Sequence, residues 1–271
     1  MKELTIDEVK EIELNLLIKF DNLCKANDWR YSMGGGTLIG AVRHKGFIPW
    51  DDDIDVLMPR PDYDAMINNS NEQEYEFNVI NYETTEGFNM PFCKISDPNT
   101  IIEDEAIDLS DYKLGVHIDV FPIDGLGNTY EDAVKQYNRT TFQRELLNAR
   151  TWKKFFRSKT HSIWIEPIRL GMFLISRFVS SKALLTAIDK ENRKVMFDEA
   201  EYCCCNCGAY RQKEIFPRKI YNEFCDMEFE DKVFRGFTNY VIYLTQIFGD
   251  YMKLPPVEKQ VSHHTFKAYH V

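Results

Sequence analysis

Four aspartates, Asp51, Asp52, Asp53 and Asp55, fall within five positions, between an aromatic turn and an apolar run. If this segment enters a β-strand, the alternation of side chains places Asp53 and Asp55 on one face and Ile54 on the other. Two carboxylates about 4 Å apart repel each other by roughly 1–4 kcal/mol, so a half-buried pair needs a cation. Oxygen ligands favour Mg²⁺, Mn²⁺ or Ca²⁺ over zinc. The sequence therefore predicts a metal site at Asp53 and Asp55.

Two other interpretations of the acidic run remain open. A solvated acidic loop is the usual explanation of a run of like charges, although the apolar residues on both sides argue against it. A calcium loop of the EF-hand type has aspartates at the same spacing. Here, however, its sixth position is Val56 rather than glycine and its twelfth is Asp62 rather than glutamate.

A third acid, Asp119, stands alone in an apolar pattern at residues 116–121. A buried strand acid needs a partner, and a metal shared with Asp53 and Asp55 would supply one. The alternative is an exposed strand face or a structural hydrogen bond.

A glycine turn at residues 34–37 lies between a predicted short strand at 29–33 and a predicted helical turn at 37–43. Consecutive glycines let the backbone approach a ligand closely, and N–H groups at a helix start can face phosphate oxygens. The spacing matches neither a dinucleotide-binding motif nor a P-loop. Because the basic residues 43–45 lie between the glycines and the aspartates, the pattern favours polyphosphate binding beside a metal.

These groups must be positioned by strands in the first half of the chain and by helices in the second, which indicates an α+β fold. Thr5 and Glu8 form a capping box at the start of a helix that is expected to end near Asp28. No flexible linker interrupts the chain, so we expect two closely joined parts, 1–128 as the catalytic core and 129–271 as a mainly helical subdomain that completes the site. Further strands are predicted at 54–58, 77–81, 92–95 and 116–121, and further helices at 131–156, 164–178, 182–201 and 240–248.

Composition limits the classes of function. The 271 residues carry 43 acidic and 33 basic side chains, a net charge of −10, which disfavours binding to a nucleic-acid polymer. The N-terminus lacks the features of a secretory signal, so the protein is expected to be cytoplasmic. Its seven cysteines are expected to be reduced. The run at 203–207 is interpreted as buried apolar thiols, with a zinc site assisted by His263 and His264 as the alternative.

The charge is unevenly distributed along the chain. Residues 139–182 contain ten lysines or arginines and only two glutamates, interleaved with tryptophans and phenylalanines. One interpretation is an amphipathic helical pair whose cations pair with the acidic remainder. The other is peripheral contact with an anionic membrane surface, where a lipid-linked acceptor would be met.

Several blocks of the sequence match the pattern of one known family. They are MGGGTLIGAVRH at 33–44, GFIPWDDDIDV at 46–56, RPDY at 60–63, IDVFPID at 118–124, and FGDYM at 248–252 followed by LPP at 254–256. Together these blocks resemble the LicD phosphotransferase family, which is related to fukutin and fukutin-related protein.

The resemblance implies a nucleotidyltransferase-like fold with a small mixed sheet, flanking helices and a helical second half. It also implies transfer of a phospho-alcohol group, phosphocholine from CDP-choline in bacterial members, to a hydroxyl of a cell-surface glycan such as lipopolysaccharide or teichoic acid, or of its lipid-linked precursor. By position, the metal ligands and catalytic residues would be Asp53, Asp55 and Asp119, and the phosphate groove would be lined by Gly35, Gly36 and Thr37.

The expected mechanism uses Mg²⁺ or Mn²⁺ held by the three aspartates to align the donor pyrophosphate. Arg43 and Lys94 are candidates for steadying the phosphates, with weak surface ion pairs as the alternative. Asp119 or Asp51 is a candidate general base. The rival functions are a metal-dependent glycosyltransferase that uses a nucleotide sugar through its Asp-x-Asp motif, and a non-catalytic metal or carbohydrate binder.

Overall fold

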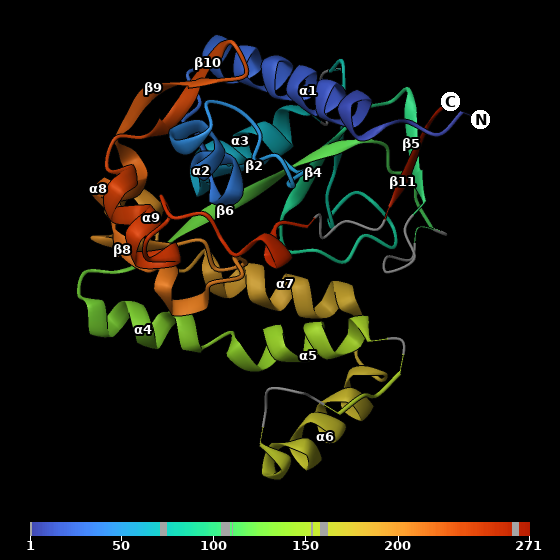
Figure 1. The fold of residues 1–271 in the computed structure, drawn as a ribbon. Coiled ribbons are helices and arrows are strands. Elements are labelled where there is room, and N and C mark those ends of the chain that lie inside the picture. Colours follow the sequence, from blue (N-terminus) through green and yellow to red (C-terminus); the bar gives the residue numbers. More distant parts are fainter. Residues whose placement is uncertain are drawn as a thin grey trace.

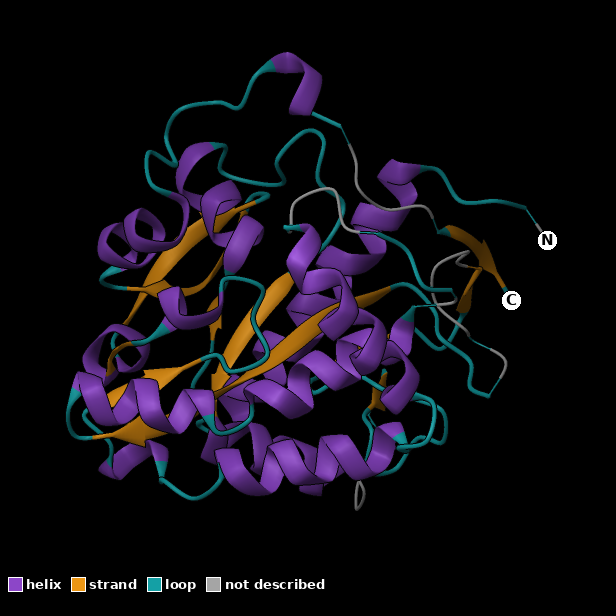
Figure 2. Cartoon of the chain, turned by 90° about the horizontal axis from the view of Figure 1, so that it is seen from below, coloured by secondary structure: helices purple, strands orange, loops and turns teal. Residues whose placement is uncertain are grey.

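The fold is built on a mixed β-sheet, as the computed structural model shows for residues 2–70, 75–103, 109, 111–152, 154–157, 162–261 and 266–271 (Figures 1 and 2). Strands β2 (Asp55–Pro59) and β6 (His117–Gly127) are parallel and lie at its centre. The other pairings are antiparallel, which confirms the α+β class. Their strands are β1 (Ser32–Met33), β3 (Asn78–Ile80), β4 (Cys93–Ser96), β7 (Tyr202–Cys204) and β8 (Phe216–Pro217).

The main hydrophobic core joins sequence from both halves of the chain. Helices α1 (Ile6–Ala26), α2 (Gly35–Arg43) and α3 (Arg60–Ser70) bury apolar side chains in one cluster with the sheet. The predicted capping box of Thr5 and Glu8 opens α1. Phe216 and Tyr221 from the second half belong to the same cluster, and β7 pairs with β6. The boundary at 128/129 stays a prediction, but the two parts share a core.

A layer of helices lies below the sheet in Figure 1. It contains α4 (Tyr130–Asn138), α5 (Thr141–Thr151) and α7 (Ser181–Asn192), while α6 (Glu166–Ser176) projects away from the body. The single helix predicted over 131–156 is wrong. The buried Thr140 hydroxyl donates to the carbonyl of Tyr137 and accepts from Arg144, and this local bonding replaces the helical pattern between α4 and α5.

The helix predicted over 182–201 is also too long. Helix α7 ends at Asn192, and the chain then forms a short 3₁₀ turn, Phe197–Glu199, before it enters β7. The side-chain amide of Gln136 donates to the carbonyl of Glu191 in the last turn of α7. Sequence periodicity could not predict that α7 ends here, because the hydrogen bond to Glu191 comes from a residue of another helix, α4.

The C-terminal part adds a hairpin that the sequence pattern did not reveal. Strands β9 (Phe224–Phe229) and β10 (Lys232–Phe237) pair through Glu230 and Asp231, which both adopt positive φ. Hairpin turns of this kind usually carry Asn-Gly or Asp-Gly, so Glu-Asp gives no signal. After α8 (Arg218–Asn222), α9 (Tyr240–Phe248) has the predicted bounds and ends at Gly249, whose φ is 70°.

The two termini meet beside a small second sheet. Strand β5 (Thr100–Glu103) pairs with β11 (Lys267–His270), and Glu3 bridges to Tyr269. Within the described residues, no single helix is both long and apolar enough to cross a bilayer.

Candidate functional site

Asp55 and Asp119 are brought side by side by the two parallel strands at the centre of the sheet. Asp55 is the first residue of β2, and its partner in the β2–β6 register is Asp119. Paired residues on neighbouring strands point to the same face and lie about 4.8 Å apart along the hydrogen-bonding direction. The backbone N–H of Asp119 donates to the carbonyl of Ile54 at 2.9 Å, which holds this register in place. Two of the three predicted carboxylates therefore adjoin.

The acidic run shows the alternation that its sequence predicted. Asp51, Asp53 and Asp55 are partly exposed, whereas Asp52, Ile54 and Val56 are buried. The segment before Asp55 is not part of the strand, yet its side chains still alternate. Asp53 and Asp55 therefore share the face that Asp119 also presents. The fully solvated acidic loop does not fit this arrangement.

The glycine turn serves close packing against the acidic run. Gly35 has a φ of 47°, and a Cβ there would lie 3.0 Å from Oδ2 of Asp55. A Cβ at Gly36 would lie 2.6 Å from Oδ2 of Asp51. Only glycine lets the N-terminus of α2 come this close to the carboxylates. The partial positive charge of that helix end is thus directed at the acidic cluster.

Thr37 ties α2 to the acidic run through its buried hydroxyl. Its Oγ1 accepts a hydrogen bond from the N–H of Asp55 at 2.8 Å and donates to the carbonyl of Asp53 at 3.5 Å. The side chain therefore orients the segment that carries both aspartates. Its role as a phosphate ligand stays a prediction.

Lys94 occupies the next position in the same row across the sheet. It belongs to β4, which runs antiparallel to β6, and it pairs in register with Asp119 of β6. Its Nζ lies 2.5 Å from Oδ1 of Asp119. The ammonium also lies 5.4 Å from the centre of the Phe92 ring. Only about 4% of Lys94 is exposed. The side chain is thus buried beside the carboxylates rather than in a surface ion pair, and its role in steadying the phosphates stays a prediction.

Arg43 is directed elsewhere. It lies in the last turn of α2, and its guanidinium donates to the carbonyl of Tyr251 at 2.7 Å. The nine-residue helix rises about 12 Å from Gly35 to this end. The structure therefore does not bring Arg43 to the carboxylates, and a phosphate contact would require it to leave Tyr251.

Glu13 is a further acid that the sequence interpretation missed. It lies on the buried face of α1, between Val9 and Leu16, and is 2% exposed. Its Oε2 has no hydrogen-bond partner among the described residues. Burial raises its pKa well above the usual range, and the charges of Asp53 and Asp52 add to the shift. An acid within the apolar stripe of a helix was the signal that could have revealed it.

The side chains at this site suit a divalent cation in their chemistry. Burial raises the pKa of Asp55 well above its usual range, and the neighbouring charges of Asp53 and Asp119 raise it further. Such a group stays ionised only with a counter-charge, and carboxylate oxygens are preferred ligands of Mg²⁺. In the described conformation, however, no three ligating side chains among the described residues stand close enough together to hold an ion. This finding extends to the cysteines at 203–207, while His263 and His264 lie outside the described residues.

A groove of about 910 Å³ opens next to the acidic cluster. Phe92, beneath the Lys94 ammonium, and Tyr210 belong to its lining. Burial raises the pKa of Tyr210, and the charges of Asp55 and Asp51 contribute, which places the phenol near the cluster. The volume is typical of sites for small organic ligands. Among the other lining residues are Tyr137, Arg144, Asn148 and Arg211.

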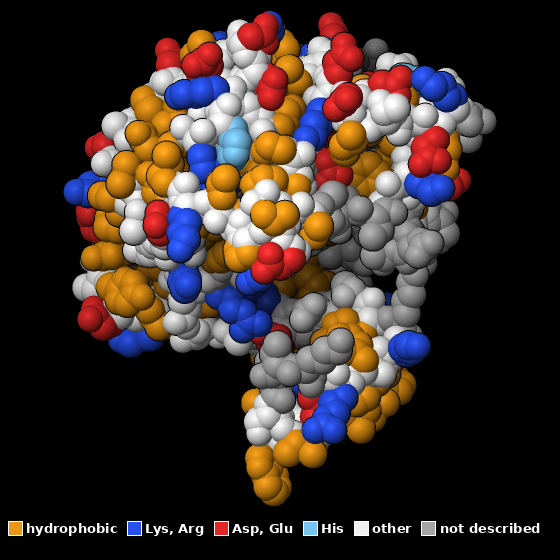
Figure 3. All heavy atoms as spheres, in the orientation of Figure 1, with side chains coloured by type: hydrophobic (Ala, Val, Ile, Leu, Met, Phe, Trp, Pro, Cys, Tyr) orange, Lys and Arg blue, Asp and Glu red, His pale blue; other side chains and the backbone are white. Residues whose placement is uncertain are grey.

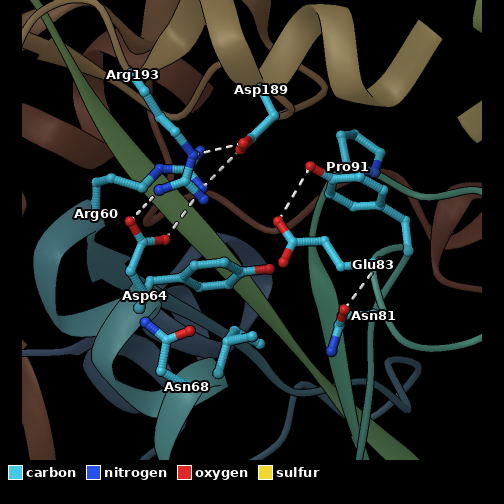
Figure 4. A pocket seen from close by; sticks show the side chains of 11 residues that line it. Arg60, Asp64, Asn68, Asn81, Glu83, Pro91, Asp189 and Arg193 are labelled. Atoms are coloured by element: carbon cyan, nitrogen blue, oxygen red, sulfur yellow. Dashed lines mark hydrogen bonds and ion pairs between the residues drawn. The ribbon is translucent and has the colours of Figure 1, made fainter. Parts of the chain in front are cut away.

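A separate cavity of about 260 Å³ lies at the other end of β2 (Figure 4). It is lined by Arg60, Asp64, Asp189 and Arg193, whose side chains bond one another. Arg60 directly follows β2, so this cavity lies about 16 Å along the strand from Asp55. Its guanidiniums are occupied by these ion pairs, and it is not the candidate site.

The comparisons with known proteins agree with this geometry. The family model described as LicD/FKTN/FKRP, nucleotidyltransferase domain, matches residues 28–162, a range that includes Asp53, Asp55 and Asp119. A lipopolysaccharide cholinephosphotransferase LicD of Haemophilus influenzae is 34% identical over 279 residues, which span 99% of each chain.

The chain belongs to the LicD family. It is therefore a LicD-type phosphotransferase, as the blocks around the glycine turn and the acidic run predicted. Uncharacterized proteins of Rickettsia typhi and Rickettsia prowazekii are 44% and 42% identical to the chain over 57 residues, 21% of its length. Within the LicD family model lie both the parallel strand pair that carries the carboxylates and the glycine turn that faces them.

Proposed function

We propose that this LicD-family protein transfers phosphocholine from CDP-choline to a hydroxyl group of a cell-surface glycan or of its lipid-linked precursor. The observation that supports the proposal best is the pairing of Asp55 with Asp119 beside the N-terminus of α2, in a chain similar over its full length to a lipopolysaccharide cholinephosphotransferase.

Asp53, Asp55 and Asp119 would hold a Mg²⁺ or Mn²⁺ ion. When bound, the ion supplies Lewis-acid stabilisation of the negative charge on the reacting phosphates. Lys94 is bonded to Asp119 at 2.5 Å, so we expect its ammonium to turn to a phosphate oxygen when Asp119 engages the cation. The rings of Phe92 and Tyr210 line the adjacent groove, which would take the choline, nucleoside or sugar parts of the substrates.

The transfer forms one bond and breaks one. The acceptor hydroxyl oxygen attacks the phosphorus that carries choline, and the bond from this phosphorus to the bridging oxygen of the donor breaks, so that CMP leaves with that oxygen. Asp51, which is partly exposed, would accept the hydroxyl proton, with Asp119 as the alternative base. Thr37 keeps the segment that carries Asp53 and Asp55 in place during the reaction.

The test is CMP release by the full chain from CDP-choline, with Mg²⁺ and lipopolysaccharide or isolated glycans as acceptor. Asp53→Asn and Asp119→Asn are expected to lower turnover at least about a hundredfold. Asp226→Asn, on an exposed position of β9, is the matched control and is expected to turn over normally. Unchanged turnover in the two site variants would refute the mechanism.

The same assay distinguishes the rival substrates. CDP-ethanolamine, CDP-ribitol and CDP-glycerol in place of CDP-choline test which alcohol is transferred. UDP-sugars test the glycosyltransferase alternative, and release of UDP without any release of CMP would favour it over phosphocholine transfer.

A further inference from the structure

The segment 162–178 forms a projecting element that we call the apolar finger, made of the 3₁₀ turn Ile163–Ile165 and helix α6. It extends from the lower side of the molecule, where hydrophobic side chains gather at its tip (Figures 1 and 3). Trp164 is 86% exposed and Phe178 is 90% exposed, far above what folded cores allow. Further exposed apolar side chains of the finger are Ile163, Ile168, Leu170, Leu174 and Ile175.

Helix α6 is apolar on several sides, yet Ser176 is its only buried residue. A helix with this composition normally lies within a protein core or within lipid. Exposed apolar patches of this kind mark interaction sites in water-soluble folds. The finger therefore presents an apolar surface that the other described residues of the chain leave exposed.

The finger is held firmly rather than left loose. Arg150 on α5 donates to the carbonyl of Ser176 at 2.8 Å, and Arg177 donates back to the carbonyls of Ala149 and Trp152. The guanidinium of Arg169 lies 4.9 Å from the centre of the Trp152 ring. These bonds fix the base of the finger to α5, so its apolar tip is presented away from the body.

The charge around the finger favours an anionic surface. Residues 139–182 carry ten basic side chains against two acidic ones, in a chain whose net charge is −10. Arg177 is exposed at the base of the finger, and Lys154 and Arg157 are exposed in the segment that leads into it. Helices that lie in the bilayer interface combine basic side chains with tryptophan, phenylalanine and leucine in this way.

Two hollows that share lining residues lie between the base of the finger and the Phe92 and Tyr210 rings. A hollow of about 1230 Å³ is lined by Arg150, Trp152 and Arg177 at the base of the finger. It shares Asn89, Met90 and Thr151 with the groove beside Tyr210 and Phe92. A substrate anchored in a bilayer below the finger could therefore reach along these hollows.

We propose that the apolar finger inserts into the interface of an anionic phospholipid bilayer and docks the enzyme on the membrane. A projecting tip fits between lipid headgroups, whereas a second copy of the chain or another protein would need a matching groove. The cations at the base then lie at headgroup level, and the hollow at the base of the finger lies on the membrane side.

The test uses the full-length protein and vesicles of phosphatidylglycerol and phosphatidylethanolamine, separated by sedimentation at low salt. The wild type is expected to sediment with these vesicles and much less with pure phosphatidylcholine. The double variant Trp164→Ser with Ile168→Ser, at the end of the finger opposite its base, is expected to lower the partition coefficient by more than about tenfold. The matched control, Ile6→Ser with Val233→Ser, removes two exposed apolar side chains outside the finger and is expected to bind like the wild type.

Two further measurements keep the proposal falsifiable. Circular dichroism and thermal unfolding show whether the finger variant is folded, and a folded variant that still binds vesicles would overturn the proposal. Insertion is also expected to shift the emission of Trp164 to shorter wavelength, an effect that Trp164→Leu removes while binding persists. Failure of the wild type to bind anionic vesicles would overturn the proposal. A molar mass that drops from dimer to monomer only in the finger variant would also overturn it, because the finger would then contact a second copy of the chain.

Discussion

The two ends of the central strand pair β2–β6 carry charge in opposite ways. At the start of β2, Asp55 and Asp119 lie side by side, Asp53 adds a further acidic side chain, and the buried Glu13 carboxyl has its pKa raised by burial and by the charges of Asp53 and Asp52. At the other end, Arg60 donates to Asp124 at 2.6 Å and to Asp189 at 3.2 Å. Arg193 completes this second network through Asp64 and Asp189. One end concentrates like charge, and the other pairs opposite charges.

The difference indicates what each end is for. A buried ion pair satisfies itself, and its loss mainly affects folding. A cluster of carboxylates with like charge destabilises the fold until a counter-charge arrives, so its retention favours a role in binding. Lys94 provides one cation at the acidic end, but it is bonded to Asp119 alone among the described acids. The acidic end is therefore expected to control activity and the paired end stability.

The largest expected effect comes from Asp55→Asn. The change removes a carboxylate from the proposed metal site and is expected to lower CMP release at least about a thousandfold. The metal-free protein is expected to be as stable as the wild type or more stable, because the amide removes a repulsion worth roughly 1–4 kcal/mol. The hydrogen bond from the N–H of Asp55 to Thr37 is unaffected. Activity assays and calorimetry in EDTA measure both effects.

The contrast fails if Asp55→Asn unfolds the protein or leaves its activity intact. Asp250→Asn is a useful control for calorimetry, because it neutralises an exposed aspartate of the loop after α9. It is expected to change the unfolding temperature little.

The next effect concerns the paired end. Arg60→Leu leaves Asp124, which is 1% exposed, without its nearest cation. The free energy of unfolding is expected to fall by about 3–5 kcal/mol, and the double variant with Asp124→Leu is expected to recover part of it. Urea denaturation measures both changes, and activity per folded molecule is expected to stay near that of the wild type.

Arg139→Leu serves as the matched control for this comparison. Its ion pair with Glu191 spans 3.4 Å at the surface, with 59% of the arginine side chain exposed, so the cost is expected to stay below about 1 kcal/mol. If Arg60→Leu abolished activity without changing stability, the paired end would have to belong to the catalytic machinery.

The sequence predicted the acidic end better than the rest of the molecule. Asp53, Asp55 and Asp119 lie in apolar strand patterns, and strand periodicity alone states which side chains share a face. The parallel pairing that aligns Asp55 with Asp119 was not predicted, since a local pattern cannot reveal which strands are neighbours; the sequence analysis proposed only that Asp119 shares a metal with Asp53 and Asp55. Glu13 was missed because a single acid in a helix is normally exposed.

Other features depended on contacts between distant segments. The break between α4 and α5 rests on the Thr140 hydroxyl, and the end of α7 on Gln136 from another helix. Arg43 was assigned to phosphate on sequence proximity, but its guanidinium donates to Tyr251, 208 positions away. Proximity in the sequence therefore did not predict the direction of the Arg43 side chain, which depends on a contact with a distant segment.

The smallest effect tests a buried carboxylate that belongs to neither end. Glu214 accepts a hydrogen bond from the N–H of Tyr210 beside the groove, and burial raises its pKa from 4.5 to about 7. The folded state thus holds this proton more tightly than the unfolded state, so stability is highest below pH 4.5 and falls as pH rises toward 7. The loss amounts to roughly 3 kcal/mol and stays constant above pH 7.

Glu214→Gln keeps the acceptor oxygen. It is expected to reduce the difference between the free energies of unfolding in urea at pH 5 and pH 8 by about this amount. Glu201→Gln, at an exposed position, should leave the difference unchanged. If Glu214→Gln also left it unchanged, the pH dependence would arise from other carboxyls whose pKa is raised by burial, such as Asp55 at the acidic end and Asp124 at the paired end.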